Sequence, residues 1–320
     1  MAVSSFLLML FYSLTITGSS CMSKLYTRSC RPVSANNSIY LFLNALFACV
    51  YFAVSVRFSL IFDWQIAKYS IIYALLISSH IIINLLTLRA MTLVLYLVFE
   101  GFGSTILPCI AEIIVFKTEI TLQIIIAIVL MSLAIFLPVL SAKKIGLNPK
   151  VVILGIFVMF FSGSANFFGK FIVANEHVNE NAPSLFFFTN AFMLIIPIIL
   201  VARSIAQSKS IIVEKQYIDN LTPEKRQKKS FYDKFHAVFP GFTILSLLCV
   251  VICTFCSNSG SLLNIVLLRR ISITLLSISS RAFSLLFSFL ASVFLFKEKI
   301  CPTEVVALSL SLAGSIVIII

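Results

Sequence analysis

The sequence is poor in charged residues, and above all in acidic ones. Only 11% of its 320 residues are charged, and Asp and Glu together number 12, whereas a soluble domain carries about 25% charged residues. Hydrophobic residues make up 60% of the chain, and its mean hydropathy is +1.08. A water-soluble fold could not bury this much apolar surface, so the composition predicts a membrane protein.

The sequence also lacks the motifs of nucleotide and metal chemistry. It contains no GxxxxGK[ST], no GxGxxG and no metal-ligand cluster. We therefore expect no ATP-driven transport by this chain, no cofactor and no bound metal. No paired carboxylates or His cluster lie at the end of an apolar run, so we expect no enzyme and no catalytic residue. The net charge is +12, but the basic residues lie in short loops, which indicates anionic lipid headgroups rather than nucleic acid as the partner.

Most of the eight cysteines lie inside apolar runs, where cysteine behaves as a small hydrophobic residue. Cys253 and Cys256 form a C-x-x-C pair, but no His and no second Cys pair lies nearby, which argues against a metal or redox site. Cys21 and Cys30 flank a predicted loop and could form a disulfide if that loop faced an oxidising space.

Charged residues bracket uncharged runs of roughly twenty residues, the length that spans a bilayer core. We predict ten membrane helices, with nine as the alternative because the sixth and seventh runs are short. The predicted helices are Val3–Cys21, Ile39–Val56, the runs between Lys68 and Arg89, between Arg89 and Lys117, between Glu119 and Lys143 and between Lys150 and Lys170, Ser184–Ala202, a span within Ala237–Leu268, Ile271–Phe296 and Ile300–Ile320. No Lys or Arg precedes Lys24, so the first run is expected to be a retained helix and not a signal peptide.

The layout of the chain predicts an internal repeat. The stretch IVFKTEITLQIIIA at Ile114–Ala127 aligns with VFLFKEKICPTEVVA at Val293–Ala307 when Phe116 is placed on Phe296. Each half has five runs and ends with a long helix, a short Lys/Glu turn and a final apolar helix. Because five is odd, the second half enters the membrane from the opposite face. This layout predicts an all-α membrane protein of two inverted five-helix repeats, 1–142 and 143–320, the second with a polar basic loop at 203–236. Inverted repeats place a binding site near the midplane.

These two stretches, with the helices around them, resemble the drug/metabolite transporter superfamily of the EamA type. In that family the fourth helix of each half lines the central cavity, and the resemblance implies the same here. The glycines usual in the last helix of each half are Ala127 and Ala307 in this sequence. GSLLN at Gly260–Asn264 is similar to the GALNK type of motif of the related nucleotide-sugar transporters, but it lacks the lysine.

Polar residues inside the predicted spans are the candidate binding residues, because a charge in the bilayer usually faces a cavity or a partner. Arg281 shares one helical face with Ser277 and Ser284, and Asn264 ends a stripe of Cys253, Ser257 and Ser261. We interpret these faces as cavity walls, with Arg281 binding an anionic group through its two-pronged guanidinium. The alternatives are a buried ion pair for Arg281 and close helix packing for the serines.

The first half supplies three further candidates. Glu100 aligns with Ser280, next to Arg281, so in the resembled fold the two charges would approach each other. They would pair in the empty site and separate when a zwitterionic substrate competes for both; a permanent structural salt bridge is the alternative. His80 and Asn84 lie one helical turn apart and could face the same cavity, although a packing role for His80 fits equally well.

We therefore expect a secondary transporter of a small organic solute, a metabolite or amino-acid exporter that works by alternating access with protons or a counter-substrate. A nucleotide-sugar or sugar-phosphate antiporter is the second interpretation, and a receptor or scaffold that moves nothing is the third. A multi-pass protein of the plasma membrane is favoured over one of the ER or Golgi, and a homodimer is compatible with the sequence. Lys and Arg are more frequent in the loops after odd-numbered helices, which would place both termini outside; the resembled family commonly has cytoplasmic termini, so orientation stays open.

Overall fold

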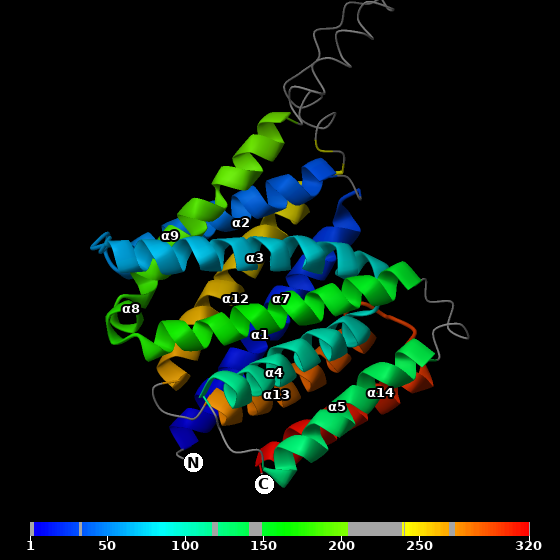
Figure 1. The fold of residues 1–320 in the computed structure, drawn as a ribbon. Helices are drawn as coiled ribbons and strands as arrows, with labels where there is room; N and C mark the ends of the chain where they lie inside the picture. The colour runs from blue at the N-terminus through cyan, green and yellow to red at the C-terminus, as the bar shows by residue number, and fades with distance from the viewer. Residues whose placement is uncertain are drawn as a thin grey trace, which may run out of the picture.

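The structure is a computed structural model that describes residues 3–31, 34–116, 121–140, 149–203, 239, 241–268 and 273–319. These residues are helical, with short connections and no strand among them. Figure 1 shows the helices as one bundle. They are α1 (Val3–Ser29), α2 (Ser34–Ser55), α3 (Trp64–Ala90), α4 (Leu93–Phe116), α5 (Leu122–Leu140), α7 (Pro149–Ala174), α8 (Glu176–Glu180), α9 (Ala182–Met193), α12 (Ile244–Leu268), α13 (Ile273–Phe294) and α14 (Pro302–Ile319).

Six helical segments in the described part are long and apolar enough to cross a membrane: Phe6–Ser29, Ala35–Ser55, Trp64–Ala90, Pro149–Ala174, Ala182–Arg203 and Ile244–Leu267. Three shorter apolar stretches lie in α4, α13 and α14. Large apolar side chains are exposed along these helices, among them Phe11, Leu75, Phe160 and Phe255. A lipid environment satisfies such a surface and water does not. The chain is thus an integral, multi-pass membrane protein.

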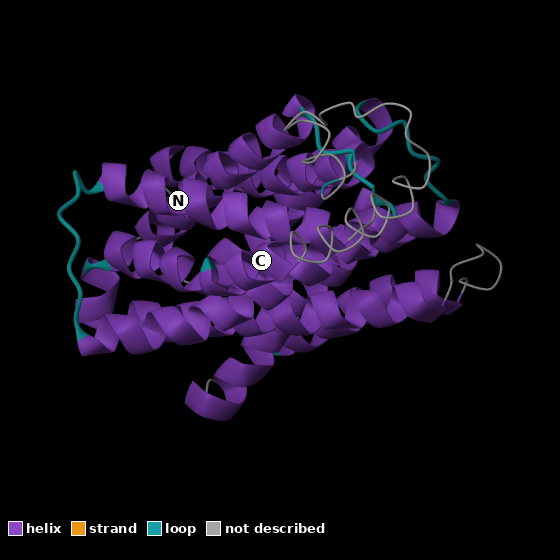
Figure 2. Ribbon diagram, turned by 90° about the horizontal axis from the view of Figure 1, so that it is seen from above, coloured by secondary structure: helices purple, strands orange, loops and turns teal. Residues whose placement is uncertain are grey.

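The long helices lie roughly side by side when the bundle is seen from above (Figure 2). α1 packs against α12 and α13, α4 packs against α7 and α13, and α5 pairs with α14 at one edge of the bundle. On the other side α2 contacts α9 and α12, and α3 contacts α7 and α9. The two ends of the chain lie at the same end of the bundle (Figure 1). The predicted repeat boundary at 142/143 and nearly all of the basic loop 203–236 lie outside the described residues.

The seventh predicted run is one membrane-length segment with an interruption. α9 ends at Met193, Leu194 is a turn residue, and helix resumes over 195–203. Pro197 explains the break, because proline has no N–H to donate to the carbonyl of Met193 four residues earlier. Asn190 lies in the last turn before the break and donates through Nδ2 to the carbonyl of Phe186 at 2.7 Å.

The first predicted helix was placed too short. α1 continues through Lys24 and Arg28 to Ser29, so Cys21 and Cys30 flank no loop, and both are free and buried. The apolar run was ended at its first positive charge, but Lys24 does not have to leave the bundle, because its ammonium group has buried partners that are described below. The structure has no disulfide between these two cysteines, because the segment that they were expected to flank as a loop is helix.

At the opposite end of the bundle, Asp63 joins α3 to α8. Its Oδ1 accepts a hydrogen bond from the backbone N–H of Ile66 at 2.8 Å and so caps α3, while Oδ2 pairs with Nε2 of His177. The bond to His177 and the cap bond lower the pKa of Asp63 below its usual range. A lowered carboxyl pKa stabilises the fold above the unfolded-state pKa, and this contribution is lost as the pH falls through the folded-state value.

We expect Asp63→Ala to lower the melting temperature of the detergent-purified protein more than Asp63→Asn does, because asparagine still caps a helix and loses only the charge. The difference between wild type and Asp63→Asn is expected to shrink as the pH falls through and below the usual carboxyl range, because the lowered pKa of Asp63 is then titrated. Equal losses for Ala and Asn would contradict the capping role.

Candidate functional site

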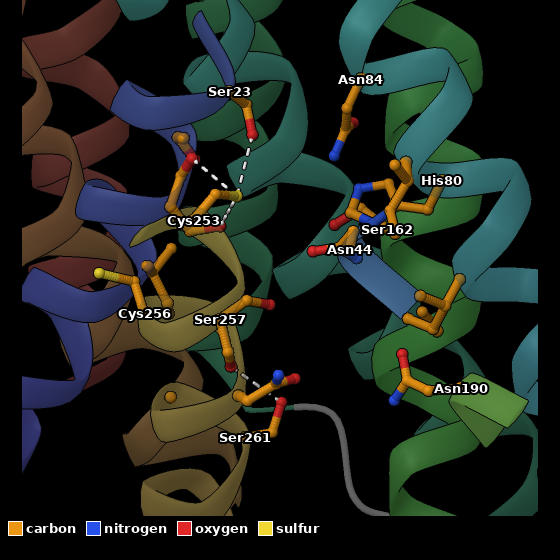
Figure 3. A pocket seen from close by; sticks show the side chains of 18 of the residues that line it. Ser23, Asn44, His80, Asn84, Ser162, Asn190, Cys253, Cys256, Ser257 and Ser261 are labelled. Carbon is orange, nitrogen blue, oxygen red and sulfur yellow. Dashed lines mark hydrogen bonds between the residues drawn. The ribbon is translucent and has the colours of Figure 1, made fainter. Parts of the chain in front are cut away.

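An internal cavity of about 240 Å³ lies between α1, α2, α3, α4, α7, α9 and α12. Figure 3 shows Cys253, Ser257 and Ser261 of α12 on one wall, facing the wall that holds His80 and Asn84 of α3 and Asn190 of α9. Ser257 is exposed although it faces this interior space, so the cavity is wide enough to admit water around its side chain.

Four of the seven residues selected from the sequence line this cavity: His80, Asn84, Glu100 and Asn264. Ser284 does not belong to its described lining. It is buried between α13 and α1, where its Oγ lies 3.5 Å from the carbonyl of Ser13. The side chains of Ser277 and Arg281 lie outside the described residues, so the predicted pairing of Arg281 with Glu100 stays a prediction.

The polar stripe on α12 faces the cavity along its whole length, from Cys253 through Ser257 and Ser261 to Asn264. Cys253 closes a hydrogen-bonded group at one end: its Sγ lies 3.0 Å from Tyr40 Oη and 3.3 Å from Ser23 Oγ, and those two oxygens are 2.9 Å apart. This C-x-x-C cysteine is therefore a partner of hydroxyl groups in the cavity wall.

Sequence reasoning missed four asparagines that also line the cavity: Asn44, Asn166, Asn190 and Asn258. Three of them form hydrogen bonds to a neighbouring helix or within their own helix. Asn44 Oδ1 accepts from Thr254 at 2.7 Å, Asn166 Nδ2 approaches the carbonyl of Ser104 at 3.4 Å, and Asn190 bonds within α9. Their sequence signal is an amide side chain inside an apolar run. Because polar groups in the bilayer are costly, such a residue is expected to face a cavity or a partner.

Three polar atoms of lining residues have no hydrogen-bond partner among the described residues: Thr189 Oγ1, Asn258 Nδ2 and Asn84 Oδ1. Thr189 and Asn258 are nearly fully buried, with 2% and 7% of their surface exposed. A buried polar group without a partner costs about 1–3 kcal/mol. Water or a ligand in the cavity would satisfy these atoms.

A charge cluster lies just beyond the end of the cavity marked by Ser23 and Leu88. Lys24 Nζ pairs with Glu298 Oε1 at 2.6 Å and donates to the carbonyl of Met91 at 2.9 Å. Arg28 also pairs with Glu298, at 2.8 Å. We call Lys24, Arg28 and Glu298 the end cluster.

Glu298 also holds two further segments. Its Oε2 accepts from the first backbone N–H of α4, at Leu93, at 3.1 Å, and from the hydroxyl of Ser292. Burial raises the pKa of Glu298, but the bonds from Lys24 and Ser292 outweigh it and hold that pKa below its usual range. The short Lys/Glu turn predicted before the last helix is present, and the Glu298 carboxylate in it is buried and joins α1, α4 and α13.

Comparison with protein-family models finds no match for this sequence, and comparison with curated proteins finds none.

Proposed function

We propose that this chain is a secondary transporter of a small organic solute, built as ten membrane helices in two inverted halves of the drug/metabolite transporter type. In this scheme α1 to α5 form the first half. α7, the segment beginning with α9, α12, α13 and α14 form the second. The observation that carries the proposal is a polar cavity lined by helices of both proposed halves.

The pattern of helix contacts supports the repeat. Exchanging each helix for its counterpart turns the α1–α12 contact into α7–α3, α1–α13 into α7–α4, α2–α12 into α9–α3 and α13–α14 into α4–α5, and all of these contacts exist. The pairs α2–α9, α4–α13 and α5–α14 each join a helix to its own counterpart. A bundle with a two-fold axis in the membrane plane has this property, and alternating access proceeds by rocking one half against the other.

The cavity volume favours a small solute over the nucleotide-sugar alternative. The cavity measures about 240 Å³. Drug-sized ligands occupy pockets of about 300–1,000 Å³. A receptor or scaffold that moves nothing would need no polar cavity between its two halves.

Reconstitution into proteoliposomes tests the proposal. We expect saturable exchange of a labelled small-metabolite mixture in wild type and its loss in Ser257→Trp, because an indole would fill the space around this exposed, cavity-facing side chain. The matched control is Phe255→Trp on the exposed apolar face of the same helix, which should transport as wild type does. Equal flux in Ser257→Trp and wild type, or flux no greater than in protein-free liposomes, would overturn the proposal.

A further inference from the structure

The described wall of the cavity is rich in amide and hydroxyl side chains. Six of its described lining residues are asparagines, four more are tyrosines on α1, α2, α3 and α4, and serines of α1, α7 and α12 add hydroxyl groups. Among the described lining side chains Glu100 is the one with a formal charge, apart from any proton on His80. Amide and hydroxyl groups both donate and accept hydrogen bonds, so most of this wall is bifunctional and uncharged.

The partnerless atoms have the same character and lie on three different helices. Thr189 Oγ1 is on α9, Asn258 Nδ2 on α12 and Asn84 Oδ1 on α3. Together they present a donor, an acceptor and a hydroxyl that can be either. A ligand carboxylate could only accept and a ligand ammonium could only donate, whereas a ligand hydroxyl group can do both.

An aromatic surface completes the lining. Phe52 and Phe186 lie 5.2 Å apart between ring centroids, Tyr73 lies 6.2 Å from Phe186, and all three border the cavity. Aromatic rings offer large apolar faces next to polar groups. Such faces suit the C–H side of a small ring whose edge carries hydroxyl groups.

From these observations we propose that the cavity binds a neutral polyhydroxylated solute of the size of a hexose or a cyclitol. The amides and hydroxyls of α3, α9 and α12 bind its hydroxyl groups, and the surface formed by Phe52, Tyr73 and Phe186 packs on its apolar face. This inference rests on the proposed transport function and names the substrate class of the same cavity.

Counterflow in proteoliposomes preloaded with one compound at a time tests this. The panel holds hexoses, myo-inositol and linear polyols, together with zwitterionic amino acids, sugar phosphates, organic anions and organic cations. We expect uptake driven by a neutral polyol. Thr189→Val should raise its KM about five- to tenfold, because it removes a hydroxyl while keeping the shape of the side chain. Asn258→Leu should have an effect of the same size.

Ser78→Ala is the matched control, since Ser78 Oγ is also buried and partnerless among the described atoms but does not border the cavity. Its KM should equal that of wild type. A deoxy analogue that lacks the hydroxyl bound by Thr189 should show the same KM in wild type and in Thr189→Val, which a merely structural role would not produce.

Two results overturn the inference in different ways. Counterflow with amino acids, sugar phosphates, organic anions or cations, but with no neutral polyol, would reject the substrate class and leave the transporter standing; anion transport would point to Arg281. Absence of counterflow with every class from a correctly folded protein would reject the transport function and the inference with it.

Discussion

Replacing Gly103 with alanine is expected to destabilise the protein by about 3 kcal/mol, at the upper end of the usual range for overpacking, and to abolish solute flux. α4 and α7 cross at this position with their backbones in contact. A Cβ on Gly103 would overlap the carbonyl oxygen of Met159 and lie 2.6 Å from its carbonyl carbon. On the other helix a Cβ on Gly163 would lie 2.5 Å from the carbonyl oxygen of Gly103.

The clash is with backbone on both sides, so no rotamer change relieves it and the helices must separate. Glu100 lies less than one turn before Gly103, and Ser162 precedes Gly163, and both border the cavity. Separation of α4 from α7 would therefore displace two walls of the site as well as cost stability.

The chain supplies matched controls for this prediction. Gly101 lies two residues away on α4 and Gly169 lies on α7, and an added Cβ at either position meets nothing within 4 Å. Gly101→Ala and Gly169→Ala should each leave flux unchanged and raise stability slightly, since alanine is favoured over glycine in helices by up to about 1 kcal/mol. Melting temperature in detergent and flux in liposomes give both readouts. A Gly103→Ala protein with wild-type values would show that the helices do not cross so closely.

The sequence predicted the helical class and part of the cavity because both follow from hydropathy. An ionisable or amide side chain inside an apolar run is costly unless it faces a cavity or a partner, and His80, Asn84, Glu100 and Asn264 all border the cavity. The same rule applies to Asn190 and Asn258. They were not selected because one amide in a run has no partner that identifies it until the helix packing brings the runs together.

The features that the sequence did not predict depend on contacts between segments that are distant along the chain. The end of α1 was misplaced because Lys24 looks like the boundary of a span, and its partner Glu298 lies near the other end of the chain. The crossing at Gly103 has no sequence signal of its own, since Gly101 on the same helix has open space where Gly103 has backbone. Hydropathy identifies which residues enter the membrane, and only packing determines which of them meet.

Glu298→Gln is expected to lower stability by about 3–5 kcal/mol, the cost of leaving one member of a buried ion pair without its partner. Lys24 is 3% exposed and Glu298 8%, so the Lys24 ammonium could not reach water when the carboxylate charge is lost. Lys24→Met combined with Glu298→Gln should recover most of the loss, because the double variant buries no unpaired charge at this position. Arg28 is half exposed and can hydrate its own charge.

Lys299→Gln is the control for Glu298→Gln. Its side chain is exposed in the same turn, so its effect should stay within about 0.5 kcal/mol. The pH dependence gives a second check. Because the pKa of Glu298 is held below its ordinary value of 4.5, wild type should keep the contribution of the ion pair through neutral pH and lose it only as acid titrates the carboxylate below that value. Glu298→Gln should lack this acid transition.

The position of the end cluster leads us to expect that breaking its ion pairs opens the neighbouring end of the cavity. It ties α1 to the turn between α3 and α4 and to the turn between α13 and α14, directly beyond Ser23 and Leu88. Cys253 is buried at this end, hydrogen-bonded to Ser23 and Tyr40.

If release of the end cluster opens this end of the cavity, a membrane-impermeant maleimide should modify Cys253 at least about tenfold faster in Glu298→Gln than in wild type. A tenfold change corresponds to a loss of about 1.4 kcal/mol in the free energy that favours the closed state. Peptide mass spectrometry measures the rate with all eight cysteines present. An unchanged rate at Cys253 in a variant that has lost stability would make the end cluster a permanent brace between the helices and place the moving end of the cavity elsewhere.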